Sequence, residues 1–538
     1  MPSNMELKRI SASPAPATGV REAPQVAKLI DTTTCIGCKA CEVACLEWND
    51  LLGIDGAAEP AQFEFGSYQT QPDLTANFWN LIRFNEHVEK NSDGSESLRW
   101  LMAKDQCQHC ADPGCLEACP SPGAIVQYAN GIVDFQQENC IGCEYCVTGC
   151  PFDIPRLNKR TRKVYKCTLC SDRVSYGLEP ACIKACPTGC LQFGAKEKLV
   201  QIANHRVNQL KADGRPKAGV YDPLGVGGTG VIYVLEFADR PELYGLPKDP
   251  VVPRTLWIWK NVLKPLGSLT MAGALVGAAI HYLRFGRNEA TDPPKDESGG
   301  QIIMNSNPLS PPAAGPLSQA EIAAIARKRE DVMVNDELIV RHKAGVRLTH
   351  WALAVFFLLA TLTGFVVYTP YFAGLAGMFG GGATARFLHP WFSLGFVISV
   401  AFLFGHWRAR MKGEPGDQEW RKNFRAYMRY ETELKEVGKY NAGQKLFFRS
   451  VILGATASLL SGIVMWFPTS FHLSLRMLAY WAHIITFIGF VVGVIYHVYM
   501  STAAMPGTLR AMTRGTVTRA WAKWHHPRWY REVSGKNE

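Results

Sequence analysis

The sequence has no cysteine outside residues 35–190 and no long uncharged apolar run before about residue 260. These two absences divide the 538 residues into a cysteine-rich part and an apolar part, which fold by different means. A third absence concerns the first 25 residues, which are rich in Pro, Ala and Ser but contain neither an apolar stretch nor a paired-arginine motif. We therefore expect no cleavable export signal.

Acidic residues are too few to balance the basic ones, and the formal net charge is +10. In a soluble protein this charge favours nucleic-acid binding, but here Lys and Arg are concentrated beside the apolar segments. Basic residues at such positions are typical of the cytoplasmic flanks of membrane spans. We therefore expect a lipid bilayer, and no nucleic acid, as a partner.

Sixteen of the 17 cysteines form four groups of four with short, repeated gaps. Gaps of two residues let a tight turn point successive thiolates at neighbouring iron atoms of a [4Fe–4S] cluster. The last cysteine of such a group cannot reach the same cluster, and in two-cluster ferredoxins it binds the other one. The spacing predicts four [4Fe–4S] clusters. The groups are Cys35, Cys38, Cys41 and Cys45; Cys107, Cys110, Cys115 and Cys119; Cys140, Cys143, Cys146 and Cys150; and Cys167, Cys170, Cys182 and Cys186.

Disulfides, zinc ribbons and a thioredoxin-like CxxC motif each account for part of this pattern, but none accounts for four repeated groups. A proline follows the last cysteine in three groups, as in bacterial ferredoxins, whereas Leu46 follows Cys45. Cys190 belongs to no group, and we expect it to be a small buried side chain.

Five apolar segments follow, each close to the roughly 20 residues that cross a bilayer as a helix. The loop between the third and fourth segments is rich in Lys and Arg, whereas the loops around 369–387 and 467–479 carry one basic residue each. Because basic loops stay in the cytoplasm, we expect the cysteine-rich part on the opposite side of the membrane. The segments are 262–283, 347–368, 388–407, 447–466 and 480–501.

Histidine is the main ionisable residue in these spans, where ionisable residues mark functional sites. His483 and His497 share the last span, about 21 Å apart along its axis and within roughly 40° of one face. The second and third spans each begin with a histidine at one of these depths, so we predict two bis-histidine b-type haems. Their ligands are His350 with His497 and His389 with His483. The histidines without such a partner, expected to be structural or interfacial, are His281, His406 and His472.

Longer motifs make both parts resemble known subunits. The first 290 residues, with AKLIDTTTCIGCKAC, YANGIVDF, CPFDIPRLNK and GVGGTGVIYVL, resemble the iron–sulfur beta subunit of respiratory formate dehydrogenase. Residues 340–531, with RLTHW, LHPWF, KYNAGQK and WAKWHHPRWYRE, resemble the cytochrome b gamma subunit of the same enzyme. These subunits are normally separate chains, whereas here a linker rich in Pro, Gly and Ser near 288–320 joins them.

The resemblance implies an electron-transfer subunit that does not itself act on formate. A separate molybdopterin-containing catalytic subunit, with molybdenum or tungsten, would oxidise formate and pass electrons through four clusters and two haems to a quinone. The quinone would contact Asn441, Gly443 and Gln444, although KYNAGQK alone also fits an ordinary helix cap. The resemblance further implies crossed cluster ligation. The sets are Cys35, Cys38 and Cys41 with Cys186; Cys167, Cys170 and Cys182 with Cys45; Cys107, Cys110 and Cys115 with Cys150; and Cys140, Cys143 and Cys146 with Cys119.

The predicted fold is α+β, with a double two-cluster, bacterial ferredoxin-like iron–sulfur domain followed by five transmembrane α-helices, the last four a haem-binding four-helix bundle. We expect a multi-pass protein of the bacterial inner membrane, with the iron–sulfur domain periplasmic and the linker and C-terminus cytoplasmic. The expected boundaries are 1–30 for a polar segment, 31–255 for the iron–sulfur domain, 256–287 for an anchor helix, 288–340 for the linker, 341–505 for the cytochrome domain and 506–538 for a basic tail.

Two other functions remain open from the sequence. The same cofactors would also serve a hydrogenase or another molybdopterin oxidoreductase. A zinc-binding membrane assembly protein is the alternative from a different class. A higher oligomer of the complex is left open as well.

Overall fold

The computed structural model describes residues 5–12, 23–51, 68–90, 94–158, 160–286, 318–334, 337–432, 434–467 and 470–535. The chain divides into two compact units, one of residues 1–262 with 363–388 and one of residues 263–362 with 389–538. Most of the predicted linker, residues 287–317, lies outside the described residues.

The first unit is built on a four-stranded sheet with the order β10-β11-β2-β9, in which only β2 and β11 run parallel. Side chains alternate between the two faces of a strand. In β2, Ala27 and Leu29 therefore pack against helix α6, while Ile30 belongs to the core on the cysteine side. The elements are β2 (Val26–Asp31), β9 (Leu191–Ala195), β10 (Gly219–Tyr221), β11 (Val231–Leu235) and α6 (Lys196–Ala212).

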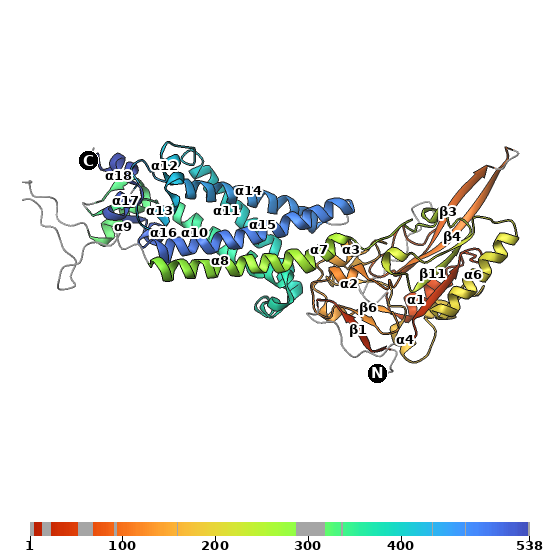
Figure 1. Ribbon diagram of the computed structural model, residues 1–538. Helices are drawn as coiled ribbons and strands as arrows, with labels where there is room; N and C mark the ends of the chain where they lie inside the picture. The colour runs from red at the N-terminus through yellow and green to blue at the C-terminus, as the bar shows by residue number, and fades with distance from the viewer. Residues whose placement is uncertain are drawn as a thin grey trace, which may run out of the picture. The chain divides into compact units, whose positions relative to one another are not determined.

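The other strands of this unit form small antiparallel sheets, and the longest is the β3–β4 hairpin that projects at the upper right of Figure 1. Five short helices begin within or directly after the cysteine turns. The strands are β1 (Leu7–Ile10), β3 (Asn80–Lys90), β4 (Glu96–Gln106), β5 (Ile125–Tyr128), β6 (Val133–Phe135), β7 (Arg156–Leu157) and β8 (Val164–Tyr165), and the helices are α1 (Ala40–Trp48), α2 (Gly114–Ala118), α3 (Tyr145–Gly149), α4 (Ser171–Ser175) and α5 (Ala181–Lys184).

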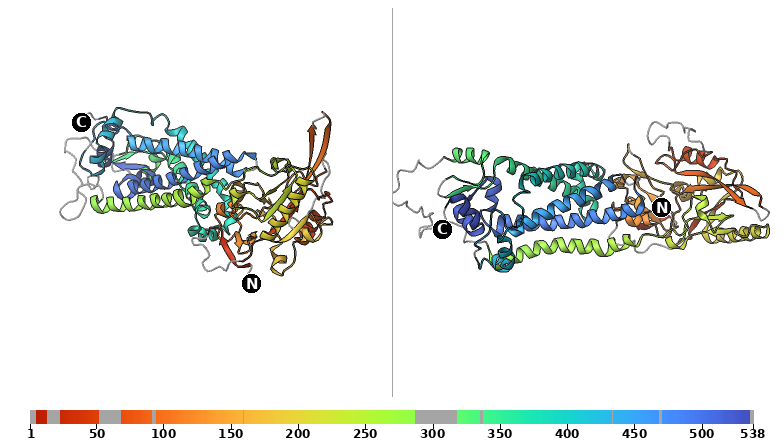
Figure 2. Two further views of the ribbon diagram at one scale, coloured as in Figure 1. Left: turned by 45° about the vertical axis from the view of Figure 1, so that its right-hand side comes forward. Right: turned by 90° about the horizontal axis from the view of Figure 1, so that it is seen from above.

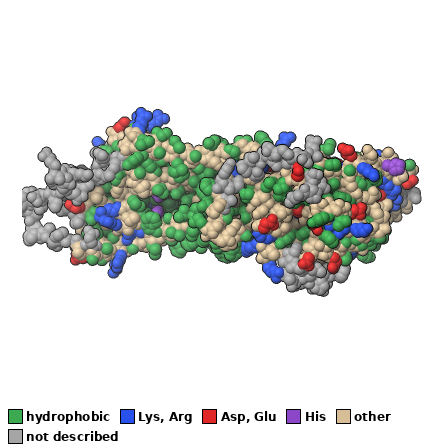
Figure 3. Space-filling view, turned by 90° about the horizontal axis from the view of Figure 1, so that it is seen from below, with side chains coloured by type: hydrophobic (Ala, Val, Ile, Leu, Met, Phe, Trp, Pro, Cys, Tyr) green, Lys and Arg blue, Asp and Glu red, His purple; other side chains and the backbone are tan. Residues whose placement is uncertain are grey.

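Five helices among the described residues are long and apolar enough to cross a membrane. Figure 2 shows the helices of the second unit running side by side, and in Figure 3 hydrophobic side chains are spread along their visible surface, with few charged ones between them. Each helix begins three to eight residues before its predicted segment. The helices are α7 (Arg254–Ile258), which continues through the π-helical turn η5 (Trp259–Leu263) into α8 (Lys264–Phe285), α10 (Ala344–Tyr368), α11 (Gly382–Trp407), α14 (Ala442–Trp466) and α15 (Leu473–Tyr499), which continues into the π-helical turn η9 (Met500–Ala504).

Parts of the ranges expected to be linker and tail are folded. Strand β13 pairs with β12 on one side and with β14 on the other, so segments from before and after the bundle share one small sheet. Arg341 is buried here and lies over the rings of Trp521 and Trp529. The elements of these two ranges are α9 (Gln319–Lys328), β12 (Val332–Met333), β13 (Leu338–Val340), α16 (Thr508–Thr513), β14 (Thr516–Thr518), α17 (Arg519–His525) and α18 (Pro527–Ser534), while α12 (Gly416–Lys422) and α13 (Phe424–Met428) lie between α11 and α14.

Candidate iron–sulfur and haem sites

The opening turns of the cysteine groups share one geometry. In three groups, the backbone N–H two residues after the first cysteine lies 3.4–3.5 Å from its Sγ and donates to it. The donating residue has a positive φ in each case, between 45° and 67°, so the turn bends its N–H groups toward the sulfur. This is the arrangement that the two-residue gaps predict for cluster loops. The pairs are His109 to Cys107, Gly142 to Cys140, and Leu169 to Cys167.

Two cavities in the first unit are lined by cysteines from both ends of the cysteine-rich part. The empty space, counted together with the open solvent at their mouths, is about 280 Å³ in one and about 420 Å³ in the other. Each brings together the last cysteine of one group and cysteines of another, in the combinations that crossed ligation requires. The first is lined by Cys45, Cys167, Cys170 and Cys182, and the second by Cys35, Cys38, Cys41, Cys186 and Cys190.

The two middle groups lie where α2 and α3 cross. Burial raises the pKa of Cys110, and the nearby sulfurs of Cys150 and then Cys107 raise it further. Burial likewise raises the pKa of Cys143, with the largest contribution from another cysteine coming from Cys119. The electrostatic neighbours of both thiols thus include the last cysteine of the opposite group, again as crossed ligation requires.

The cysteine thiols are arranged in a way that suits iron–sulfur clusters better than disulfides or single metal ions. All 17 cysteines are free thiols. In the described part of the chain, no group of three or more His, Cys, Asp or Glu side chains could hold a single metal ion, which a zinc site would need. Buried thiols whose pKa values are raised become thiolates when iron binds, because a coordinating metal removes the proton. The residues present therefore fit iron–sulfur clusters.

Cys190 is buried, as predicted, and it also interacts with two cysteines of the predicted cluster groups. Its Sγ lies 3.5 Å from Sγ of Cys186. A hydrogen bond from Cys190 is also the main cause that lowers the pKa of Cys35 to about 6.

Sequence reasoning did not find three buried lysines beside the cysteines. Burial alone would lower the pKa of Lys28, but the sulfurs of Cys182 and Cys167 outweigh it and raise the pKa above its usual value. Lys166 shows the same balance, and its Nζ donates to the carbonyl oxygens of Val133 and Cys167 at 2.6 and 2.9 Å. The third, Lys104, is 2 % exposed. Strand alternation in VAKLID was the available signal for Lys28, because it places this residue on the same face as Ile30.

The four histidines predicted to bind haem form two pairs within the second unit. The ring centroids of His389 and His483 are 6.1 Å apart, and those of His350 and His497 are 6.2 Å apart. An iron atom held between two imidazoles, with bonds of about 2 Å to nitrogens about 1 Å from each centroid, needs a separation of about 6 Å. Both pairs therefore fit one six-coordinate iron.

Hydrogen-bond partners orient both imidazoles of the pair formed by His389 and His483. Nδ1 of His389 lies 3.1 Å from the carbonyl oxygen of Ala360, to which it can donate. Nδ1 of His483 lies 3.0 Å from Oγ of Ser461. Ligating histidines normally use the second ring nitrogen in this way, which leaves Nε2 for the metal. In the other pair, Phe447 stacks on His497 with centroids 4.8 Å apart and ring planes 5° apart.

The other membrane-domain histidines have different partners. Nδ1 and Nε2 of His281 lie 2.6 Å from Oη of Tyr499 and 3.0 Å from the carbonyl oxygen of Met428, so both ring nitrogens are engaged. Nε2 of His406 lies 3.2 Å from a carboxylate oxygen of Glu330, and His472 caps α15 by accepting from a backbone N–H.

The residues predicted to bind quinone form a helix cap. The Asn441 side chain accepts from the Gln444 backbone N–H at 2.9 Å, and the Gln444 side chain accepts from the Asn441 N–H at 3.1 Å. The cap uses both amide oxygens and leaves both NH₂ groups as donors. Gly443 lies against Trp420, whose ring would be 2.8 Å from an added Cβ.

Models of known families match most of the chain. Two 4Fe-4S dicluster domains match residues 34–124 and 98–196, the transmembrane segment of formate dehydrogenase N matches 252–294, and prokaryotic cytochrome b561 matches 341–515. The nitrate-inducible formate dehydrogenase iron–sulfur subunit of Escherichia coli K12 is 55 % identical over 274 residues, which are 51 % of this chain and 90 % of that protein. The formate dehydrogenase iron–sulfur subunit of Haemophilus influenzae is 54 % identical over 283 residues, 51 % of this chain and 88 % of that protein.

Cysteine turns of the ferredoxin type and histidine pairs in an apolar bundle define a membrane-anchored electron-transfer protein with iron–sulfur clusters and b-type haem. Its fold class and the family resemblance predicted from the sequence are confirmed. The chain belongs to the family of formate dehydrogenase iron–sulfur subunits, fused to a cytochrome b561 region, and is a multi-pass membrane electron-transfer subunit of formate dehydrogenase.

Proposed function

We propose that this subunit carries electrons from a separate molybdenum or tungsten catalytic subunit through four [4Fe–4S] clusters and two b haems to a quinone. The proposal rests above all on the two histidine pairs, each spaced for one iron and separated by about four turns of α15. The subunit itself has no proposed chemistry on formate. When bound, the clusters and haems supply one-electron transfer, and the chain holds and spaces them.

The proposed cluster ligands are the four crossed sets implied by the family resemblance. The cysteine linings of the two cavities support two of these sets. The electrostatic neighbours of Cys110 and Cys143 support the other two.

The proposed quinone site lies beside the haem of His350 and His497. Phe447, which stacks on His497, is one helical turn from Gln444, so the cap of α14 and this haem ligand are close neighbours. The NH₂ groups of Asn441 and Gln444, which the helix cap does not use, can donate to a quinone carbonyl oxygen. Binding of quinone and the capping of the helix are thus compatible uses of the same two side chains.

We propose that the iron–sulfur domain faces the periplasm. Lys and Arg side chains lie at the left end of the bundle in Figure 3, which is the end where Figure 1 marks the C-terminus, as expected for a cytoplasmic end. Within the first unit, Arg386 at the start of α11 pairs with Glu144 at 3.0 Å, so the weakly basic α10–α11 loop packs with the cysteine turns. Electrons released outside and protons taken up inside would store about 2.3 kcal/mol per charge for each 100 mV.

The experiment is formate oxidation by the purified complex in sealed proteoliposomes, with the catalytic subunit identified by mass spectrometry. We expect formate to reduce clusters, haems and quinone and to generate a membrane potential. The His497→Ala variant should still reduce its clusters with formate but lose most quinone reduction. Full quinone reduction in that variant would contradict the proposal.

A further inference from the structure

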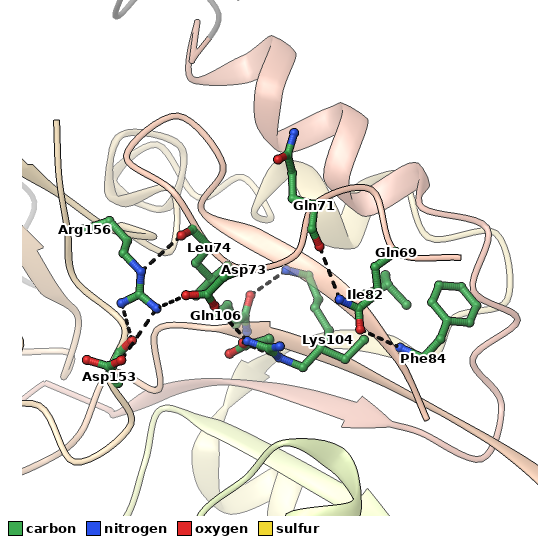
Figure 4. Close-up of polar contacts among 12 residues, drawn as sticks. Gln69, Gln71, Asp73, Leu74, Ile82, Phe84, Lys104, Gln106, Asp153 and Arg156 are labelled. Atoms are coloured by element: carbon green, nitrogen blue, oxygen red, sulfur yellow. Dashed lines mark hydrogen bonds and ion pairs between the residues drawn. The ribbon is translucent and has the colours of Figure 1, made fainter. Parts of the chain in front are cut away.

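Two lysines of the first unit are buried and meet at one amide oxygen. Lys28 on β2 and Lys104 on β4 are 0 % and 2 % exposed, and Gln106 between them is 0 % exposed. Oε1 of Gln106 accepts from Nζ of Lys28 at 2.9 Å and from Nζ of Lys104 at 2.7 Å. Figure 4 shows the contact between Lys104 and Gln106. We call these three residues the lysine bridge.

The buried carboxylate of Glu42 interacts electrostatically with Lys104 of the lysine bridge. Neither lysine forms an ion pair with a carboxylate in the described part of the chain, although two like charges held by one oxygen atom repel each other. Buried charges of this kind are retained when an opposite charge lies close by. The nearest candidates are sulfurs, because Nζ of Lys28 donates to Sγ of Cys182 at 3.2 Å.

The lysine bridge also lies between two proposed cluster sites. Lys28 and Gln106 line the cavity of Cys45, Cys167, Cys170 and Cys182. Lys104 lines this cavity and also the cavity that contains Cys35, Cys38, Cys41 and Cys186. The side chain of Lys104 therefore lies at both proposed cluster sites.

The amide nitrogen of Gln106 gives independent evidence for a missing acceptor. Because both neighbours of its oxygen are ammonium donors, the NH₂ group must face away from them. This buried Nε2 has no hydrogen-bond partner among the described residues. Buried donors are normally satisfied, and cluster sulfurs are acceptors of the right kind in the adjoining cavity.

We propose that the lysine bridge couples these two clusters electrostatically and raises the reduction potential of both. One-electron reduction adds a negative charge to a cluster, and a fixed positive charge beside it stabilises the reduced form more than the oxidised form. Lys104, which faces both cavities, acts on both clusters, while Lys28 acts mainly on the cluster of Cys182. This inference rests on the proposed function, since it requires that both cavities hold clusters.

The test is an EPR-monitored redox titration of the purified full chain in its complex, which follows each cluster separately. Lys104→Met should lower the potential of two of the four clusters, with at least a tenfold change in each reduction equilibrium, or about 59 mV for one electron. Lys104→Arg keeps the charge and should keep both potentials near those of the parent protein. Lys196→Met is the matched control, because Lys196 in the same unit pairs with Asp222 instead of sulfur.

Three outcomes separate the possible failures. Four clusters with unchanged potentials in Lys104→Met would overturn the inference and leave the proposed function intact. Absence of cubane signals from the parent protein would instead refute the proposed function. If Lys104→Met does not assemble its clusters, the uncharged but polar Lys104→Gln is measured by the same criterion, and unchanged potentials there overturn the inference.

Discussion

Replacing His483 with alanine removes one of the two axial ligands from the proposed haem of His389 and His483. His483 and His497 are fourteen residues apart on one continuous helix, which separates the two sites by about 21 Å. Local repacking around position 483 does not reach that far. We therefore expect the haem content to fall from two to one per chain, with the haem of His350 and His497 retained.

A milder substitution tests the same site without removing a haem ligand. Ser461→Ala removes the hydroxyl that lies 3.0 Å from Nδ1 of His483. Loss of a hydrogen-bond partner of a metal-binding histidine typically weakens metal binding about 10–100-fold. The matched control is His472→Ala, which changes the N-cap of the same helix but touches neither histidine pair.

The assay is haem quantification combined with an optical redox titration of the purified variants. His483→Ala should lack one complete b-type component, Ser461→Ala should hold the same haem more weakly, and His472→Ala should show both components. Retention of both haems in His483→Ala would refute the pairing of His389 with His483, and loss of both would refute the independence of the two sites.

Three further predictions concern other parts of the chain. Gly114→Ala should destabilise the packing of α2 on α3 by about 1–3 kcal/mol and lower the iron content, because the added Cβ would lie 2.3 Å from the carbonyl oxygen of Gly149. The control is Gly194→Ala, whose Cβ meets nothing within 4 Å, and it should change neither the stability nor the iron content. Asn441→Ala should lower the free energy of unfolding by about 1 kcal/mol, because the helix cap is lost, and should raise the KM for quinone roughly 3–10-fold. The control is Ser318→Ala, which breaks a similar cap on α9 and should leave the KM for quinone unchanged. Removal of iron by a chelator should expose the cysteine-rich part to limited proteolysis and leave the helical bundle protected.

Patterns with a strict period could be predicted from the sequence. The cysteine gaps predict turns whose N–H groups face sulfur, and the structure has these turns at Cys107, Cys140 and Cys167. The depth of each histidine follows from helical rise alone, so the spacing of His483 and His497 was enough to propose partners for both. In each case a fixed local geometry, either the shape of the cysteine turn or the rise per residue of an α-helix, connects the sequence to the structure.

Features that depend on tertiary contacts could not be predicted in this way. Strands β12, β13 and β14 are only two or three residues long, which is too short to show an alternating pattern. They also pair although β12 and β13 precede the helices of the bundle in the sequence and β14 follows them. Lys104 looks like a surface residue in the sequence, because lysine is almost never buried without a partner. Its partner is an amide two residues away together with sulfurs that only the fold brings near.

The most direct test of the whole electron path is to quantify iron and haem in one purified sample and to titrate both by EPR and optical spectroscopy. We predict about sixteen iron atoms in cubane clusters and two six-coordinate b haems per chain. Far less iron, zinc in its place, or the absence of a pair of six-coordinate haems would contradict the proposed path.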